Sequence, residues 1–203
     1  IGAGQEKVYT ADELAAVAPR GTKQALSGAN RDIWLAEVLR DFRMTRDKGC
    51  YVKITPVKPE GRSPPAIEQR FQFKYKGPGP IKLSDLKEEE KKARTIARGD
   101  RFKYGEDYGA TASPVAAAPV NKLLVAWAVQ KGLLLFKLDQ SAAFYGNPMD
   151  RAGIWVRLPM GYHPTKDELR PLDAPPLYAE LAMSVPGIPQ GSLVHYQGLA
   201  KDM

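Results

Sequence analysis

The chain has 203 residues, of which 43% are hydrophobic and 26% are charged, and its formal net charge is +7 at pH 7. These values are typical of a globular protein long enough to build one substantial core or two small ones. The single cysteine, Cys50, excludes an internal disulfide and a zinc site built from cysteines, and no apolar run approaches the roughly 20 residues that span a bilayer.

The basic excess leaves two interpretations open. It is either a solvated surface or the mark of a polyanionic partner, above all nucleic acid. The chain begins with Ile1 rather than Met. This favours a processed precursor, with an organelle or a cleaved polyprotein as its origin.

The N-terminal third is expected to be mostly helical. Thr10 and Glu13 have capping-box spacing, which predicts a helix over 11–17 that ends before Pro19. This first segment is either an extension that docks on a partner or a frayed leader. A second helix is predicted from Asp32 to about Arg46. Its apolar stripe for packing is Trp34, Leu35, Val38, Leu39 and Phe42, and its opposite face is Arg40, Asp41, Arg43 and Arg46.

Two strands should follow, at 51–54 and 69–76. The second alternates cleanly, with Phe71, Phe73 and Tyr75 on one face and Arg70, Gln72, Lys74 and Lys76 on the other. That basic row suits either a phosphate backbone or water. Further on, Glu88–Glu90 precede Lys91, Lys92 and Arg94 at helical ion-pair spacing. Arg98, Arg101 and Lys103 alternate with aromatic residues, a pattern that fits RNA contact or packing on a neighbour.

The stretch 121–162 contains the main elements predicted for the rest of the chain. It predicts a helix, a turn at Lys131-Gly132, a strand over 133–138 that ends at Asp139, and a second strand over 154–156. A strand-end Asp suits a magnesium ligand, because Mg²⁺ prefers oxygen, but it also suits a turn or a helix cap. Many prolines follow, so only short elements are expected: a helical turn or strand over 177–184 and a loop over 187–197.

Several segments resemble the reverse transcriptases of copia-type retrotransposons. KLDQSAAFYGN followed by IWVRLPMGY is similar to the family's LDVxxAFLNG and IYMxxPxGF, and KKARTIARGDRFKYGEDYGATASPVA to YKARLVARGFxQxxGxDYxETFxPVA. Trp34, Glu37, Gly49 and Val57 match its opening block. PLYAELAMSVPGIPQGSLVHY resembles a degraded LYxLxKxLYGLKQAPRxWY. The likeness covers about residues 22–200 in colinear order.

The resemblance implies an α+β fold, namely the fingers and the first half of the palm of a right-hand polymerase. It divides the chain into an extension at 1–21, a fingers-like region at 22–120 and a partial palm at 121–203. It also implies roles for single residues. Asp139 would be a vestigial catalytic carboxylate, Lys92 and Arg94 would meet the triphosphate, Phe144 would screen the sugar 2′ position, and Gln190 would border the nucleotide pocket. Phe144 equally suits ordinary core packing. The nucleic-acid contacts are predicted at Arg98, Arg101, Lys103, Lys74 and Lys76.

The carboxylates for catalysis are incomplete. Polymerase chemistry requires two metal ions held by converging carboxylates, and this family takes two of them from an Asp-Asp hairpin. No Asp-Asp pair occurs in the 203 residues. One carboxylate does not hold two metal ions, so no metal site and no cofactor is predicted. The pocket segments also depart from the family pattern at Gly146-Asn147, Arg151-Ala152 and Val185-Pro186-Gly187.

The leading interpretation is a domesticated, catalytically inactive, RNA-binding structural protein of a large assembly. An organellar ribosome is the favoured assembly, with rRNA and neighbouring subunits as partners, in the mitochondrial matrix rather than the cytoplasm. One alternative is the N-terminal part of an active reverse transcriptase that a missing part or a separate chain completes, with Mg²⁺ as its cofactor. Another is a protein-only subunit of a respiratory or photosynthetic complex. A partner, or the extension 1–20, is expected to cover the open edge of the palm sheet.

Overall fold

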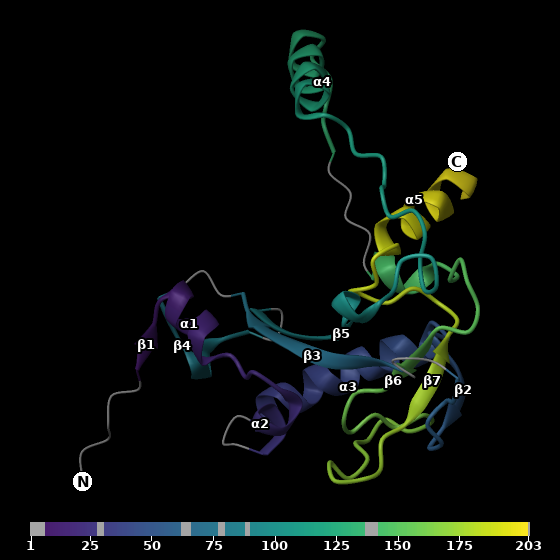
Figure 1. Ribbon diagram of the computed structural model, residues 1–203. Helices are drawn as coiled ribbons and strands as arrows, with labels where there is room; N and C mark the ends of the chain where they lie inside the picture. The colour runs from purple at the N-terminus through teal and green to yellow at the C-terminus, as the bar shows by residue number, and fades with distance from the viewer. Residues whose placement is uncertain are drawn as a thin grey trace, which may run out of the picture.

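The computed structural model describes residues 7–27, 31–61, 66–76, 80–87, 90–136 and 142–202. Helices and strands are interspersed along the chain (Figure 1). In order they are β1 (Val8–Tyr9), α1 (Ala11–Val17), α2 (Thr22–Ser27), α3 (Arg31–Asp47), β2 (Tyr51–Thr55), β3 (Ile67–Tyr75), β4 (Ile81–Lys82), η1 (Leu83–Asp85), β5 (Lys91–Ala97), η3 (Gly99–Arg101), α4 (Ala118–Gln130), η4 (Ala143–Gly146), β6 (Trp155–Arg157), β7 (Tyr178–Leu181) and α5 (Gly191–Asp202).

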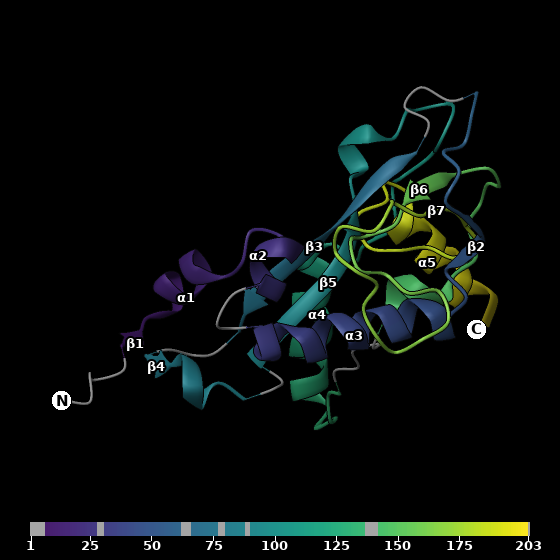
Figure 2. The ribbon, with the colours of Figure 1, turned by 90° about the horizontal axis from the view of Figure 1, so that it is seen from below.

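A five-stranded sheet forms the body of the molecule, in the order β2-β7-β6-β3-β5. Strands β3 and β6 pair in parallel, and the other neighbours pair antiparallel. Viewed from below, α3 lies across β3 and β5 (Figure 2). The fold is therefore a mixed one of helices and sheet, as the sequence predicts.

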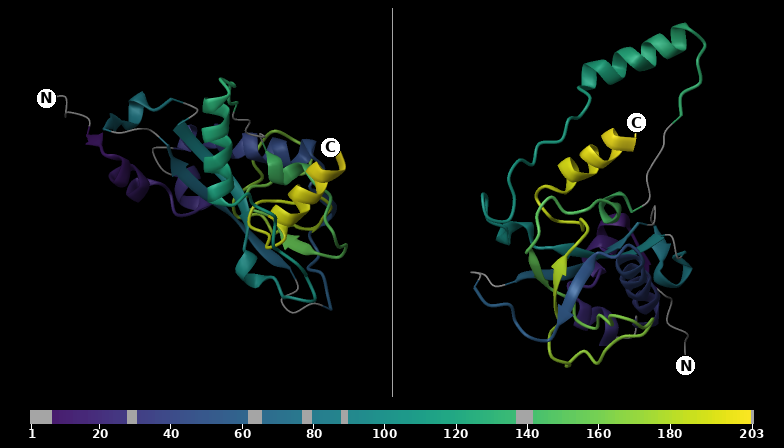
Figure 3. Two further views of the ribbon diagram at one scale, coloured as in Figure 1. Left: turned by 90° about the horizontal axis from the view of Figure 1, so that it is seen from above. Right: turned by 90° about the vertical axis from the view of Figure 1, so that its right-hand side faces the viewer.

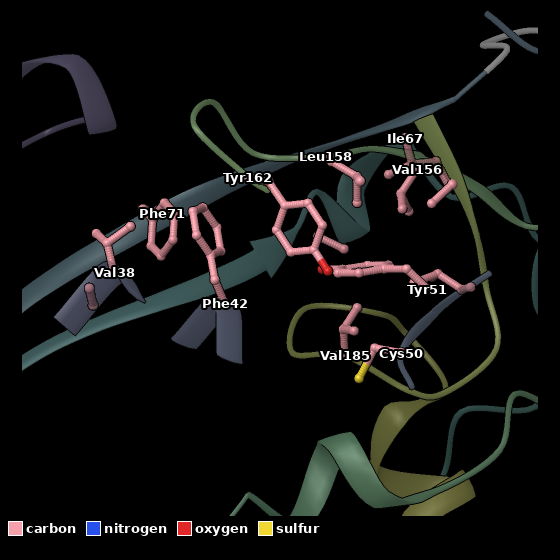
Figure 4. Packing of buried hydrophobic residues seen from close by; sticks show 14 of the residues in the cluster. Val38, Phe42, Cys50, Tyr51, Ile67, Phe71, Val156, Leu158, Tyr162 and Val185 are labelled. Atoms are coloured by element: carbon pink, nitrogen blue, oxygen red, sulfur yellow. The ribbon is translucent and has the colours of Figure 1, made fainter. Parts of the chain in front are cut away.

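The core lies between α3 and the sheet. Phe42 of α3 meets Phe71 of β3 at 5.2 Å between ring centroids and Tyr162 at 5.0 Å (Figure 4). Trp34 lies about two helical turns before Phe42 on the same face of α3, and it packs edge-on against Phe73. The predicted apolar stripe is thus confirmed, because Trp34, Val38 and Phe42 are fully buried. Each such side chain contributes about 1.5–3 kcal/mol by leaving water.

Strand β3 confirms the predicted alternation, with buried and exposed residues in strict turn from Ile67 to Lys74. It pairs with β5, where Gln72 lies opposite Arg94 and Lys74 opposite Lys92. The expected helical ion pairs at the start of this segment are wrong, because Lys91–Ala97 is a strand. Its inner residues Ala93, Thr95 and Ala97 are buried, and this alternation together with the pairing to β3 decides the conformation.

The N-terminal helix begins as predicted. The Thr10 hydroxyl accepts from the Glu13 N–H and the Glu13 carboxylate accepts from the Thr10 N–H, so the capping box is complete. The preceding strand β1 pairs with β4. Residues 7–20 therefore add no strand to the five-stranded sheet, and the cover of its edge by a partner stays a prediction.

Helix α4 and the turn after it are confirmed, but the strand predicted over 133–138 is not. Residues 133–136 have no regular structure, and 137–138 lie outside the described residues. A strand needs a hydrogen-bonded neighbour, and none of the described strands lies beside this segment. Helix α4 stands away from the body (Figures 1 and 3). Most of its apolar side chains are exposed, including Leu123, Leu124 and Trp127.

The C-terminal segments complete the sheet and end in a helix. Of the two structures predicted for 177–184, the strand is the one that forms, as β7. The loop predicted over 187–197 is wrong from Gly191 onward, where α5 starts. No proline follows Pro189, so nothing interrupts the helical hydrogen bonds that begin with Val194 N–H to Gln190 C=O. In the described parts of the chain, no helix is long and apolar enough to cross a membrane.

Candidate functional site

A cavity of about 660 Å³ lies between α3, β5 and the segment that contains η4. Three cationic side chains line it: Arg40 from α3, and Lys92 and Arg94 from β5. Phe144 of η4 contributes an aromatic wall, and Pro186 also borders the space. The structure thus brings together three of the four residues predicted for a nucleotide pocket.

The cations of this cavity lie close enough to act on one another. Burial lowers the pKa of Lys92, and the charges of Arg94, Lys76 and Arg40 lower it further. Each of these groups disfavours another positive charge nearby. Arg40 also binds the buried Glu37 carboxylate, so the positive charge that a bound anion would relieve lies mainly on Lys92 and Arg94.

Asp41 lies in the wall of the same cavity, and sequence reasoning placed it on the wrong face of its helix. Its carboxylate is 3% exposed. It accepts hydrogen bonds from the Thr95 N–H at 2.9 Å and the Tyr145 hydroxyl at 3.1 Å. Burial raises its pKa. The spacing could have located it, because Asp41 follows Trp34 by seven residues and so shares the buried face.

Gln190 has another environment. Its side chain is fully buried, and its amide nitrogen donates to the Asp107 carbonyl and to the Asp150 carboxylate, each at 3.3 Å. The amide therefore points away from the cavity. The adjacent Gly191 lies against Phe144, because a Cβ there would be 3.3 Å from Phe144 Cδ1.

The predicted nucleic-acid contacts divide into two groups. Arg98 binds the Asp100 carboxylate at 2.7 Å, Arg101 lies 3.6 Å from the same group, and Lys103 lies 3.5 Å from Glu106. These three cations therefore have acidic neighbours, although Arg98 and Arg101 share one carboxylate. Lys74 and Lys76 are exposed, with Lys74 on the face of β3 that points away from the core.

Asp139 lies outside the described residues. Among the residues that are described, no three His, Cys, Asp or Glu side chains gather closely enough to hold a metal ion. Asp41 is the carboxylate in the cavity wall, and its two oxygens already accept from Thr95 and Tyr145. Among the described residues, the lining of the cavity therefore holds one carboxylate, which is hydrogen-bonded through both oxygens.

Comparison with known proteins agrees with the sequence motifs. The family model described as reverse transcriptase (RNA-dependent DNA polymerase) matches residues 60–201, which include β3, β5, η4 and α5. No curated protein and no solved structure matches the chain. Because the family match spans well over half of the 203 residues, the chain belongs to the copia-type reverse transcriptases.

Proposed function

We propose that the chain forms the fingers and the first palm half of a right-hand polymerase, and that its cavity binds the triphosphate of a nucleotide. The observation that carries this proposal is the convergence of Arg40, Lys92, Arg94 and Phe144 on one space. A cavity of about 660 Å³ has the size of sites that enclose a small molecule.

The chemistry of these residues suits a nucleoside triphosphate. Guanidinium groups bind phosphate oxygens with paired hydrogen bonds, and an ammonium supplies a compact positive charge. Phe144 would lie against the sugar as a flat apolar surface. The positive charges of Lys92, Arg94 and Arg40 repel one another, and a bound phosphate would reduce this repulsion. The reduction would contribute to the affinity.

Binding is proposed without catalysis by this chain alone. The sequence contains no Asp-Asp pair, and both Asp41 oxygens are taken. Polymerase activity would require that the missing carboxylates be supplied from outside these 203 residues.

Calorimetric titration with dATP and with tripolyphosphate, in the presence of EDTA, tests the proposal. The double variant Lys92→Ala/Arg94→Ala should bind both ligands at least tenfold more weakly. Arg101→Ala is the matched control, because that arginine is exposed and paired with Asp100 outside the cavity. Equal losses in the two variants, or no binding by the wild type, would overturn the proposal.

A second candidate is the scaffold role, in which an inactive chain of retrotransposon origin binds rRNA within a mitochondrial ribosome. The exposed row of Lys74 and Lys76 favours it, as does the apolar surface of α4, which a neighbouring subunit would cover. Measuring the affinity for RNA at several salt concentrations tests this scaffold role. Lys74→Ala/Lys76→Ala should reduce the slope of that dependence by about one to two. An unchanged slope would leave the protein-only subunit as the scaffold alternative.

A further inference from the structure

The Asp41 carboxylate connects the two opposite walls of the cavity. Its Oδ2 accepts from the backbone N–H of Thr95 and its Oδ1 accepts from the hydroxyl of Tyr145. Thr95 is the immediate neighbour of Arg94 on β5, and Tyr145 is the immediate neighbour of Phe144 on η4. The buried Asp41 carboxylate is therefore hydrogen-bonded to the residue beside the cationic Arg94 and to the residue beside the aromatic Phe144.

The position of Asp41 follows from the topology. Strand β5 is the outermost strand of the sheet, so the outward N–H of Thr95 has no strand partner and must find another acceptor. The Tyr145 side chain is 1% exposed, so its hydroxyl also needs an internal partner. A carboxylate has two oxygens and serves both donors at once.

The η4 wall depends on such a contact. Ala142, the residue before η4, has a φ of 57°, a left-handed conformation that alanine rarely adopts. The contacts around this turn must hold it, and the bond from Tyr145 to Asp41 is one of them. Losing that bond would free Phe144 to move relative to Lys92 and Arg94.

We infer that Asp41 is a positioning residue, which fixes the cationic wall of β5 and the aromatic wall of η4 at the spacing that a nucleotide requires. This inference rests on the proposed function for its ligand. Asp41 and α3 precede the matched residues 60–201, so the site would extend beyond the part of the chain that the family model matches.

Three variants separate this role from a merely structural one. Asp41→Ala removes both acceptors, Asp41→Asn keeps an acceptor and a polar partner, and Tyr145→Phe removes one bond and leaves the carboxylate. Asp41→Ala should lower the affinity for dATP and for tripolyphosphate about tenfold, and Asp41→Asn should restore it to within about threefold. Tyr145→Phe should weaken dATP alone, because it loosens the wall of Phe144 and not that of the cations.

Native-state hydrogen exchange at the Thr95 amide gives a readout that needs no ligand. Exchange there should accelerate at least tenfold in Asp41→Ala and stay near the wild-type rate in Tyr145→Phe. If the wild type binds neither dATP nor tripolyphosphate, the proposed function fails, and Thr95 exchange still decides whether Asp41 holds β5. Unchanged exchange in Asp41→Ala overturns the inference. If Asp41→Ala does not fold, Tyr145→Phe is the deciding variant. An equal loss of affinity for dATP and for tripolyphosphate in that variant overturns the inference.

Discussion

The backbones of Gly99 and Gly187 are in direct contact. A Cβ on Gly99 would overlap the carbonyl oxygen of Gly187, and a Cβ on Gly187 would overlap that of Ala97. The Ala97 N–H also donates to the Pro186 carbonyl at 2.8 Å. The end of β5 therefore docks, backbone to backbone, on the segment that leads into α5. Pro186 borders the cavity, so this contact also fixes one of its sides.

Gly187→Ala should be strongly destabilising for two reasons. Its φ of 91° is unfavourable for alanine, and the new Cβ would overlap the backbone of Ala97. We expect the free energy of unfolding, measured with urea, to fall by about 2–4 kcal/mol. Gly105→Ala is the control, with a φ of 86° and nothing within 4 Å of the new Cβ. A loss as large in the control would show that strain alone, and not the contact, is responsible.

The aromatic core predicts a large difference between two phenylalanines. Phe42→Ala removes a ring that packs on Phe71 and Tyr162, and it should lower the free energy of unfolding by about 3–5 kcal/mol. Phe136→Ala removes a ring that is 83% exposed and should change that free energy by less than about 0.5 kcal/mol. Denaturant titration of both variants checks this. Similar losses would mean that Phe136 is buried in solution.

Stability should depend on pH through Asp41. Burial raises its pKa above the ordinary value of 3.8, so the folded chain holds this proton more tightly than the unfolded chain does. The wild type should therefore lose stability relative to Asp41→Asn as the pH rises from about 3.8 through the raised pKa. Below 3.8 the difference should be constant. Urea titrations of both proteins across this range measure it, and a difference independent of pH would contradict the assignment.

The apolar surface of α4 should bind a hydrophobic dye. Leu124 and Trp127 are 53% and 51% exposed. Replacing both with Gln should reduce the fluorescence of bound anilinonaphthalene sulfonate while the free energy of unfolding changes by less than about 0.5 kcal/mol. Lys122→Gln, at an exposed position of the same helix, should leave the fluorescence unchanged. Strong destabilisation by the double replacement would mean that α4 packs on the body in solution.

The sequence predicts correctly those elements that are defined by residues close to one another in the chain. The bonds between Thr10 and Glu13 lie within one helical turn, and the alternation of β3 lies within one strand, so both could be predicted. Strand β5 could not, because its charges also fit a helix and only its pairing with β3 decides. The residues 133–136 show the opposite case, in which a strand-like sequence has no partner strand among the described residues.

The candidate site was predicted unevenly for the same reason. Family motifs pointed to Lys92, Arg94 and Phe144, and the structure places them on one cavity. Arg40 and Asp41 were missed because their part in the site depends on how α3 lies against β5. The contact that Arg98 and Arg101 both make with the Asp100 carboxylate was not predicted, and their role in binding nucleic acid stays a prediction.

The order of strands has a consequence for synthesis on the ribosome. Strands β2 and β3 are made early, yet in the sheet they are separated by β7 and β6, which come more than 70 residues later. Until Leu181 has left the exit tunnel, β2 has no neighbour and the sheet has a gap in its middle. The nascent chain must hold Tyr51, whose ring packs on Tyr162, without this late partner until the later segments emerge, which makes it a natural client for chaperones.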